Sequence, residues 1–198
     1  MNKKVLFITD TLEELDLKKD TSILMMEESI KLGFDVYQCL VEDLYAENSE
    51  VIVFAKKITT AGSSEIKFVD ASTHSIKTFE YSFMRKDPPV DEDYINALHL
   101  LGLAQAMGTK VFNNPVSIKE FNEKVFAIHF AKYIPETLIS SKIDKIKSFI
   151  KDKKEIVVKP LDGMGGKSIY KMDKIQDSEI ETLLKMTNNE STQIITQE

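Results

Sequence analysis

The stretch from Glu155 to Tyr170, EIVVKPLDGMGGKSIY, brings together residue types that bind phosphate. An apolar run leads to Lys159, and three of the chain's seven glycines follow within a span of four residues. Glycine tolerates a positive φ and lets another molecule approach the main chain closely, so successive N–H groups can turn toward one anion. The residues expected to form this phosphate cradle after Lys159 are Gly163, Gly165, Gly166 and Ser168.

Two common phosphate-binding motifs do not fit this stretch. A Walker A loop needs a glycine where Leu161 stands, and the dinucleotide-binding fingerprint needs glycine or alanine where Ser168 stands. Both motifs also need a helix after the loop, whereas residues 168–172 alternate in polarity and predict a strand. The loop is therefore expected to join two strands, and an ordinary hairpin turn stays open as the alternative.

Arg85 is the one arginine among 26 basic residues. A planar guanidinium binds a carboxylate or phosphate through two parallel hydrogen bonds, which lysine cannot reproduce. Pro88 and Pro89 follow shortly, and prolines cannot continue a strand ladder, so Arg85 is expected to be held at a strand end. Arg85 is thus a candidate anion ligand, with a chance arginine or a surface ion pair as the other interpretation.

Composition excludes several classes of function. The chain has 198 residues, 42% of them hydrophobic, which is enough for a substantial core in one large or two small domains. A net charge of -6 provides no basic field for nucleic acid, and no apolar run is long enough for a signal peptide or a membrane span. Cys39 is the only cysteine, so no internal disulfide can form, and we predict a cytoplasmic protein.

The elements that position these residues follow from sequence periodicity. A strand over 4–9, a helix over 23–32 and a strand over 35–40 predict a β-α-β unit, and ligands bind at the carboxyl ends of such strands. Acidic residues at the start and Gly108 at the end predict a helix over 91–107. The middle region predicts short strands interrupted at Lys56–Lys57 and a strand over 75–81, and residues 46–81 receive no site assignment.

The second part of the chain is expected to begin near residues 115–120. A capping box that starts at Ser117 predicts one helix through Ala131, which carries Lys124. Further predicted elements are helices over 143–151 and 178–186 and a strand over 193–197. The last strand has no visible partner after it in the sequence.

Long strings in this chain resemble the bacterial glutathione synthetase family of the ATP-grasp superfamily. The longest are FMRKDPPVD at residues 83–91 and VVKPLDGMGGKSI at 157–169. Shorter matching strings occur in the same order, namely LKKDTS at 17–22, NNPVSIKEFNEK at 113–124 and PETL at 135–138.

The resemblance implies an α/β fold with two domains. Residues 1–118 are expected to form a pre-ATP-grasp domain with a Rossmann-like parallel sheet. Residues 119–198 are expected to form the small α+β ATP-grasp subdomain, whose glycine loop covers the nucleotide. The family's large C-terminal subdomain supplies its magnesium ligands, and this sequence reaches only Gln197–Glu198, where the family's chain enters the adenine-binding hinge. We therefore predict no metal ligand here and expect these residues alone to lack ligase activity, which an ADP-release assay checks.

The resemblance also implies roles for individual residues. Lys124 and Lys159 match the lysines that hold the ATP phosphates, and the glycine loop with Ser168 matches the cover over the β and γ phosphates. Lys18 and Arg85 match positions that face the peptide substrate. Arg85 and Lys159 are expected to act in catalysis.

The implied reaction is the ATP-dependent ligation of γ-glutamylcysteine with glycine through an acyl phosphate, which gives glutathione, ADP and phosphate. The implied ligands are ATP and Mg²⁺, and the intact family forms homo-oligomers. Two alternatives stay open. One is another ATP-grasp carboxylate–amine ligase, such as a D-alanine–D-alanine or ribosomal-protein-modifying type, and the other is a non-catalytic nucleotide- or peptide-binding fragment.

Overall fold

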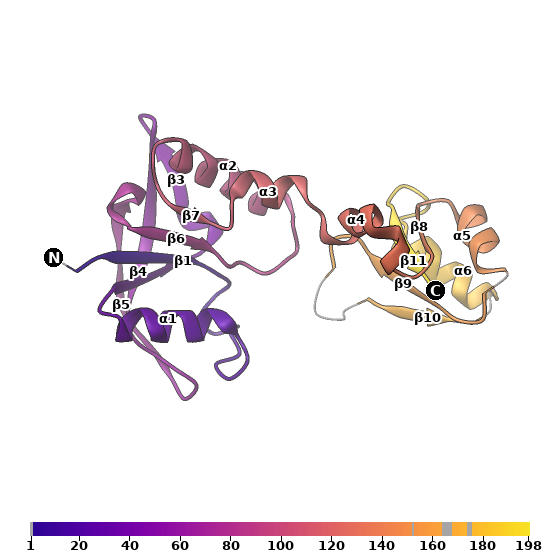
Figure 1. The fold of residues 1–198 in the computed structure, drawn as a ribbon, viewed down its shortest axis with the longest axis horizontal. Coiled ribbons are helices and arrows are strands. Elements are labelled where there is room, and N and C mark those ends of the chain that lie inside the picture. The colour runs from indigo at the N-terminus through magenta and orange to yellow at the C-terminus, as the bar shows by residue number, and fades with distance from the viewer. Residues whose placement is uncertain (1, 152, 164–167, 174–175) are drawn as a thin grey trace. The chain divides into compact units, whose positions relative to one another are not determined.

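A computed structural model describes residues 2–151, 153–163, 168–173 and 176–198. The chain forms two compact units, Met1–Glu120 and Phe121–Glu198, each an α/β unit with its own sheet (Figure 1). Among the described residues, no helix combines the length and apolarity needed to cross a bilayer. The main elements of the first unit are β1 (Lys4–Ile8), α1 (Thr21–Lys31), β2 (Asp35–Cys39), β3 (Leu44–Glu47), β4 (Glu50–Ala61), β5 (Ile66–Ser75), β6 (Tyr81–Met84), α2 (Glu92–Ala106), β7 (Val111–Phe112) and α3 (Pro115–Glu120).

The sheet of the first unit is mixed. Its strand order is β3-β4-β2-β1-β6-β7, and β5 pairs with β4. Strands β2, β1, β6 and β7 are parallel, whereas β3, β4 and β5 join through antiparallel pairs. The predicted α/β class is confirmed. The expected parallel arrangement holds for β2, β1, β6 and β7 only, and Arg85 lies directly after β6 in this part of the sheet.

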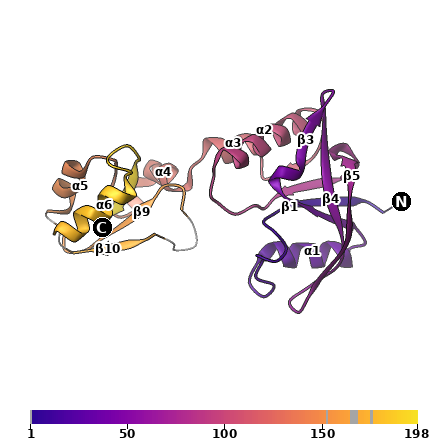
Figure 2. The ribbon, with the colours of Figure 1, turned by 180° about the vertical axis from the view of Figure 1, so that it is seen from behind.

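Alternation along β1 places the two helices on opposite faces of this sheet. Val5 and Phe7 pack in one core cluster with Met26 of α1, and Leu6 and Ile8 pack in another with Leu98 of α2. Figure 1 shows α1 on one side of the sheet and α2 on the other, and the reverse view in Figure 2 agrees. Each such fully buried side chain stabilises the fold by about 1.5–3 kcal/mol, which holds the carboxyl ends of the strands in place.

Two predictions for the middle region are wrong, namely the break at Lys56–Lys57 and the strand over 75–81. Strand β4 continues through Lys56 and Lys57, because Lys57 pairs with β2 in the ladder and its Nζ lies 2.8 Å from the Asp35 carboxylate. The predicted strand over 75–81 is a short 3-10 helix, Ile76–Thr78, anchored by a buried isoleucine, and strand structure resumes at β6. Both differences arise from contacts between segments, which local alternation does not contain.

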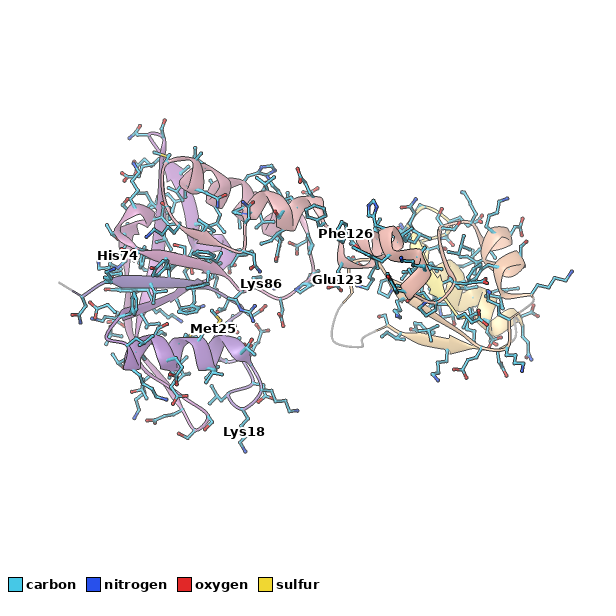
Figure 3. The ribbon with its side chains drawn as sticks, in the orientation of Figure 1. Lys18, Met25, His74, Lys86, Glu123 and Phe126 are labelled. Atoms are coloured by element: carbon cyan, nitrogen blue, oxygen red, sulfur yellow. The ribbon has the colours of Figure 1, made fainter. Side chains whose placement is uncertain are left out.

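His74 of β5 lies in an aromatic cluster at one end of this unit (Figure 3). Its ring centroid is 4.8 Å from that of Tyr37 and 5.7 Å from that of Phe79, in edge-on contacts. Nε2 lies 2.9 Å from the Ser72 hydroxyl oxygen. Burial, with a smaller effect from Lys4, lowers the pKa of His74 below its ordinary value of 6.5.

Acidification is expected to destabilise the first unit through His74. The lowered folded pKa means that the unfolded chain binds more protons once the pH falls below about 6.5, so the free energy of unfolding decreases from there down to the folded pKa. The variant His74→Phe should remove this part of the loss. Urea unfolding at pH 7.5 and pH 5.5 measures it, and His129→Phe in the other unit is the control. Equal pH dependence in His74→Phe and wild type would contradict the assignment.

The second unit contains a four-stranded sheet in the order β10-β9-β11-β8. Strand β11 is central, since it pairs antiparallel with both β8 and β9, which precede it in the sequence. Helices α5 and α6 pack on one face of this sheet, against Ile156, Val158 and Ile194. The elements are α4 (Glu123–Phe126), a 3-10 helix (Ala127–Tyr133), β8 (Thr137–Ser140), α5 (Ile143–Ile150), β9 (Ile156–Pro160), β10 (Tyr170–Met172), α6 (Asp177–Met186) and β11 (Ile194–Gln197).

The predicted single helix from Ser117 to Ala131 is instead three short pieces. Asn114 rather than Ser117 caps α3, because its Oδ1 accepts hydrogen bonds from the backbone N–H groups of Val116 and Ser117. Asn122 then caps α4 by accepting from two further N–H groups. Asparagine side chains compete for backbone donors in this way, and a second cap eight residues after the first interrupts the helix.

Candidate functional site

Arg85 lies immediately after β6, where its backbone N–H donates to the carbonyl of Ile8 at the end of β1. Its guanidinium reaches the first turn of α1, with Nη2 2.7 Å from the Thr21 hydroxyl and Nε 3.3 Å from the Ser22 hydroxyl. These contacts use two of the five N–H groups of the guanidinium. A cation beside a helix N-terminus opposes the helix dipole, and both groups attract an anion. The arrangement can bind a carboxylate.

Asp10 links the two strand ends beside Arg85. The carboxylate lies 2.6 Å from the ammonium of Lys86, and its other oxygen accepts a hydrogen bond of 2.9 Å from the backbone N–H of Asp87. Lys86 also donates to the carbonyl of Asp87. The side chains of Asp10 and Lys86 are only 21% and 20% exposed, so solvent screens this pair less than a surface pair.

We expect Asp10→Asn to lower the free energy of unfolding of the first unit by about 1–2 kcal/mol, because a charge-assisted hydrogen bond and an ion pair are lost together. The midpoint of urea unfolding measures this. Glu65→Gln is the matched control, since its ion pair with Lys67 is far more exposed, and the change should stay within about 0.5 kcal/mol. A similar loss in both variants would show that Asp10 contributes no more than a surface charge.

Three carboxylates surround the two cations of this site. Burial, together with the charges of Asp10 and Asp20, raises the pKa of Asp87, and Arg85 and Lys86 partly offset that effect. Asp20 is also the N-cap of α1, where it accepts from the Ser22 N–H. The site therefore presents positive and negative groups side by side, which suits a zwitterionic ligand such as an amino acid.

Lys18 lies on the loop before α1, and its side chain is exposed. Figure 3 shows the side chain pointing away from the sheet, whereas Lys86 lies at the end of β6. The structure brings Arg85 to the N-terminus of α1 and does not place Lys18 against it. The substrate-binding role of Lys18 stays a prediction from the family resemblance.

Lys124 in the second unit is bound to the beginning of the glycine loop. Its Nζ donates to the carbonyls of Gly163, at 2.7 Å, and Leu161, at 3.3 Å. The side-chain amide of Asn122 donates to the same Leu161 carbonyl at 3.1 Å. Figure 3 shows Glu123, the first residue of α4 and the neighbour of this lysine, and its carboxylate lies 3.1 Å from the Lys124 ammonium. The ammonium is therefore placed at the loop that is expected to bind phosphate.

Gly163 was expected to adopt a positive φ, but its φ lies outside the left-handed region. Glycine is needed here for lack of space, because a Cβ at this position would lie 2.5 Å from Cγ of Pro160. A side chain would therefore push the loop away from the end of β9. Ser168 has φ +57° at the other end of the loop. Gly165 and Gly166 lie outside the described residues.

Lys159 is the next-to-last residue of β9, just before the loop. Its ammonium donates to the Gln197 side-chain oxygen at 3.0 Å. The antiparallel pairing of β10 with β9 confirms that the loop joins two strands. Lys124 and Lys159 thus both lie near the carboxyl end of β9, and both ammonium groups are partly buried. Two ammonium groups near one strand end can each bind an oxygen of a polyphosphate.

Metal-ligating residues do not gather in either unit as far as the structure describes them. Within the described ranges, no group of three or more His, Cys, Asp or Glu side chains could hold a metal ion. Cys39 is buried, and burial raises the pKa of its thiol, which disfavours the thiolate form that acts as a nucleophile.

Comparison with known proteins assigns both units to one family. The model of the prokaryotic glutathione synthetase N-terminal domain matches residues 3–119, and that of the prokaryotic glutathione synthetase ATP-grasp domain matches residues 123–198. The glutathione synthetase of Neisseria meningitidis serogroup A is 33% identical over 192 residues, 92% of this chain and 60% of that protein. The glutathione synthetase of Vibrio vulnificus YJ016 is 31% identical over 188 residues, which cover 94% of this chain and 59% of that protein. The chain spans about 60% of the length of these relatives.

Solved structures show the same fold at low sequence identity. D-cycloserine synthetase DcsG matches with a TM-score of 0.61 and 15% identity over 98% of this chain and 58% of its own. D-alanyl-alanine synthetase A from Vibrio cholerae matches with a TM-score of 0.57 and 16% identity, and the match covers 99% of this chain and 60% of that protein. These likenesses support the α/β fold.

Proposed function

Since the chain belongs to the prokaryotic glutathione synthetase family, we propose that it provides peptide- and ATP-binding residues for the ligation of γ-glutamylcysteine with glycine. The observation that carries this proposal is that two models of one ligase family match the two halves of the chain in order. The family is one of ligases that use ATP. Residues 1–118 are the proposed pre-ATP-grasp domain, and 119–198 the proposed small ATP-grasp subdomain.

The ATP subsite is proposed for the second unit. Lys124 and Lys159 bind phosphate oxygens, and the loop from Gly163 through Gly165 and Gly166 to Ser168 covers the β and γ phosphates with its N–H groups. Phosphoryl transfer needs little covalent chemistry from the protein, because positioning and neutralisation of charge provide most of the catalysis. The contacts of Lys124 with the loop carbonyls and of Lys159 beside the loop support this assignment. Mg²⁺ is expected to accompany ATP and to neutralise phosphate charge.

The peptide subsite is proposed for the first unit. Arg85 binds a carboxylate of γ-glutamylcysteine, because its guanidinium and the N-terminus of α1 together favour an anion. The nearby carboxylates of Asp10 and Asp87 match the α-ammonium group of the same glutamyl moiety. Lys18 is a further proposed peptide ligand.

The proposed reaction proceeds in two steps. The cysteinyl carboxylate of γ-glutamylcysteine attacks the γ phosphorus of ATP, the bond to the β-phosphate oxygen breaks, and an acyl phosphate and ADP form. The amine of glycine then attacks the acyl carbon, loses a proton, and expels phosphate to leave the amide. Lys159 and Arg85 are the proposed catalytic residues, since Lys159 is expected to hold the reacting phosphate and Arg85 to orient the peptide through its glutamyl carboxylate.

Titration calorimetry on the 198-residue chain tests the binding part of this proposal. ATP with magnesium and γ-glutamylcysteine should each bind, and D-alanine should not. A chain that binds D-alanine in place of γ-glutamylcysteine would indicate another ATP-grasp ligase. A chain that binds neither ATP nor the peptide contradicts the assignment of both subsites.

A further inference from the structure

Three polar side chains share one face of the sheet in the second unit. Thr137 of β8 is directly opposite Gln197 of β11 in the antiparallel register, and Lys159 of β9 is opposite the neighbouring Ile195. Side chains of paired residues lie on the same face of a sheet, and residues two apart on a strand also share a face. The face of Thr137, Gln197 and Lys159 is therefore opposite the one that α5 and α6 cover through Val158 and Ile194.

These side chains form a hydrogen-bond chain with one consistent direction. The Thr137 hydroxyl donates its single proton to the Pro135 carbonyl at 2.8 Å, so toward Gln197 it can only accept. The Gln197 amide nitrogen accordingly donates to Thr137 Oγ1 at 3.0 Å. This turns the amide oxygen toward the Lys159 ammonium, which donates to it at 3.0 Å. A flipped amide would point its NH2 group at the ammonium and lose both contacts.

We propose that Thr137 and Gln197 are positioning residues that hold the Lys159 ammonium in place before ATP binds. The inference rests on the proposed ATP-binding role of Lys159. A lysine side chain loses considerable rotamer freedom when a ligand fixes it, and prior fixation removes part of that entropic cost from binding. One of the three N–H donors of the ammonium binds Gln197, which leaves the others for phosphate oxygens. Thr137 acts only through Gln197.

The first experiment measures Lys159 without any nucleotide. Trace acetylation with acetic anhydride, read by mass spectrometry, reports how freely each lysine reacts, with Lys185 as the internal reference. Thr137→Val should raise the relative acetylation of Lys159 by about two- to tenfold, the factor expected for loss of one hydrogen bond. Thr137→Ser, which keeps the hydroxyl, should restore the wild-type value. Thr182→Val is the matched control, because that hydroxyl bonds to a helix carbonyl in the same unit and is expected to leave Lys159 unchanged.

A double-variant cycle separates positioning from general destabilisation. Gln197→Met should raise Lys159 acetylation as Thr137→Val does, and the double variant should add nothing further, because both changes break one chain. Unchanged acetylation in Thr137→Val, or additive effects in the double variant, would overturn the proposal. If Thr137→Val fails to fold, the test rests on Gln197→Met. Unchanged acetylation of Lys159 in that variant would likewise overturn the proposal.

ATP protection keeps this test distinct from that of the proposed function. If Lys159 binds ATP, adding ATP with magnesium lowers its acetylation in the wild-type chain, and Thr137→Val requires more ATP for the same protection. Absence of protection together with the predicted variant effects would remove the ATP role of Lys159 and leave its positioning intact. Protection that is equal in wild type and Thr137→Val would show that positioning does not assist binding.

Discussion

Replacement of Lys159 by alanine is expected to weaken ATP binding to the 198-residue chain by about 10- to 150-fold, because a charge-assisted hydrogen bond contributes about 1.5–3 kcal/mol. Lys159 is partly buried and bound to Gln197 at the end of β9, so its charge is poorly screened and its position is set before the ligand arrives. Titration calorimetry with ATP and magnesium measures the loss. The affinity for γ-glutamylcysteine should not change.

Lys171→Ala is the matched control for this variant. Lys171 lies on the neighbouring strand β10, but its ammonium is bound to Glu155 and its side chain is 71% exposed. Removing this lysine deletes the same charge from the same sheet, and its effect on ATP affinity should stay below about threefold. Equal losses in both variants would show that net charge rather than the location of Lys159 governs binding.

Local sequence signals predicted the elements that need no distant partner. Asp20 and Asp91 cap α1 and α2 with their own carboxylates, and Gly33 adopts φ +82° after α1, so the information lies within a few residues. The continuity of β4 depends on the pairing of Lys57 with β2, and the central place of β11 depends on β8 and β9. Such pairings join segments far apart in sequence, and no local pattern specifies them.

The candidate sites divide in the same way. Composition singled out Arg85, and the glycine loop singled out Lys159 and its surroundings. The partners of these residues come from distant segments: Thr21 is 64 positions from Arg85, and Gln197 is 38 from Lys159. Single hydroxyl and amide groups carry no distinctive sequence signal, although polar residues directly after buried strands, such as Asp10, indicate where to search.

The variant Arg85→Lys is expected to weaken γ-glutamylcysteine binding by about tenfold or more, although the positive charge remains. Lysine supplies a point charge in place of the planar fork and cannot bond a carboxylate bidentately while it also binds the hydroxyls of Thr21 and Ser22. Arg85→Ala should weaken γ-glutamylcysteine binding further, by about 100-fold relative to wild type. Calorimetric titration with the peptide measures both, and ATP affinity provides the internal control.

Thr21→Val tests whether the geometry of the guanidinium matters beyond its presence. The change removes the hydroxyl 2.7 Å from Nη2 and keeps Arg85 itself, so peptide affinity should fall by about two- to tenfold, between wild type and Arg85→Ala. Thr21→Ser should restore binding, because it returns the acceptor. If Arg85→Lys binds the peptide as tightly as wild type, a single positive charge suffices, and the reason proposed for an arginine at this position is wrong.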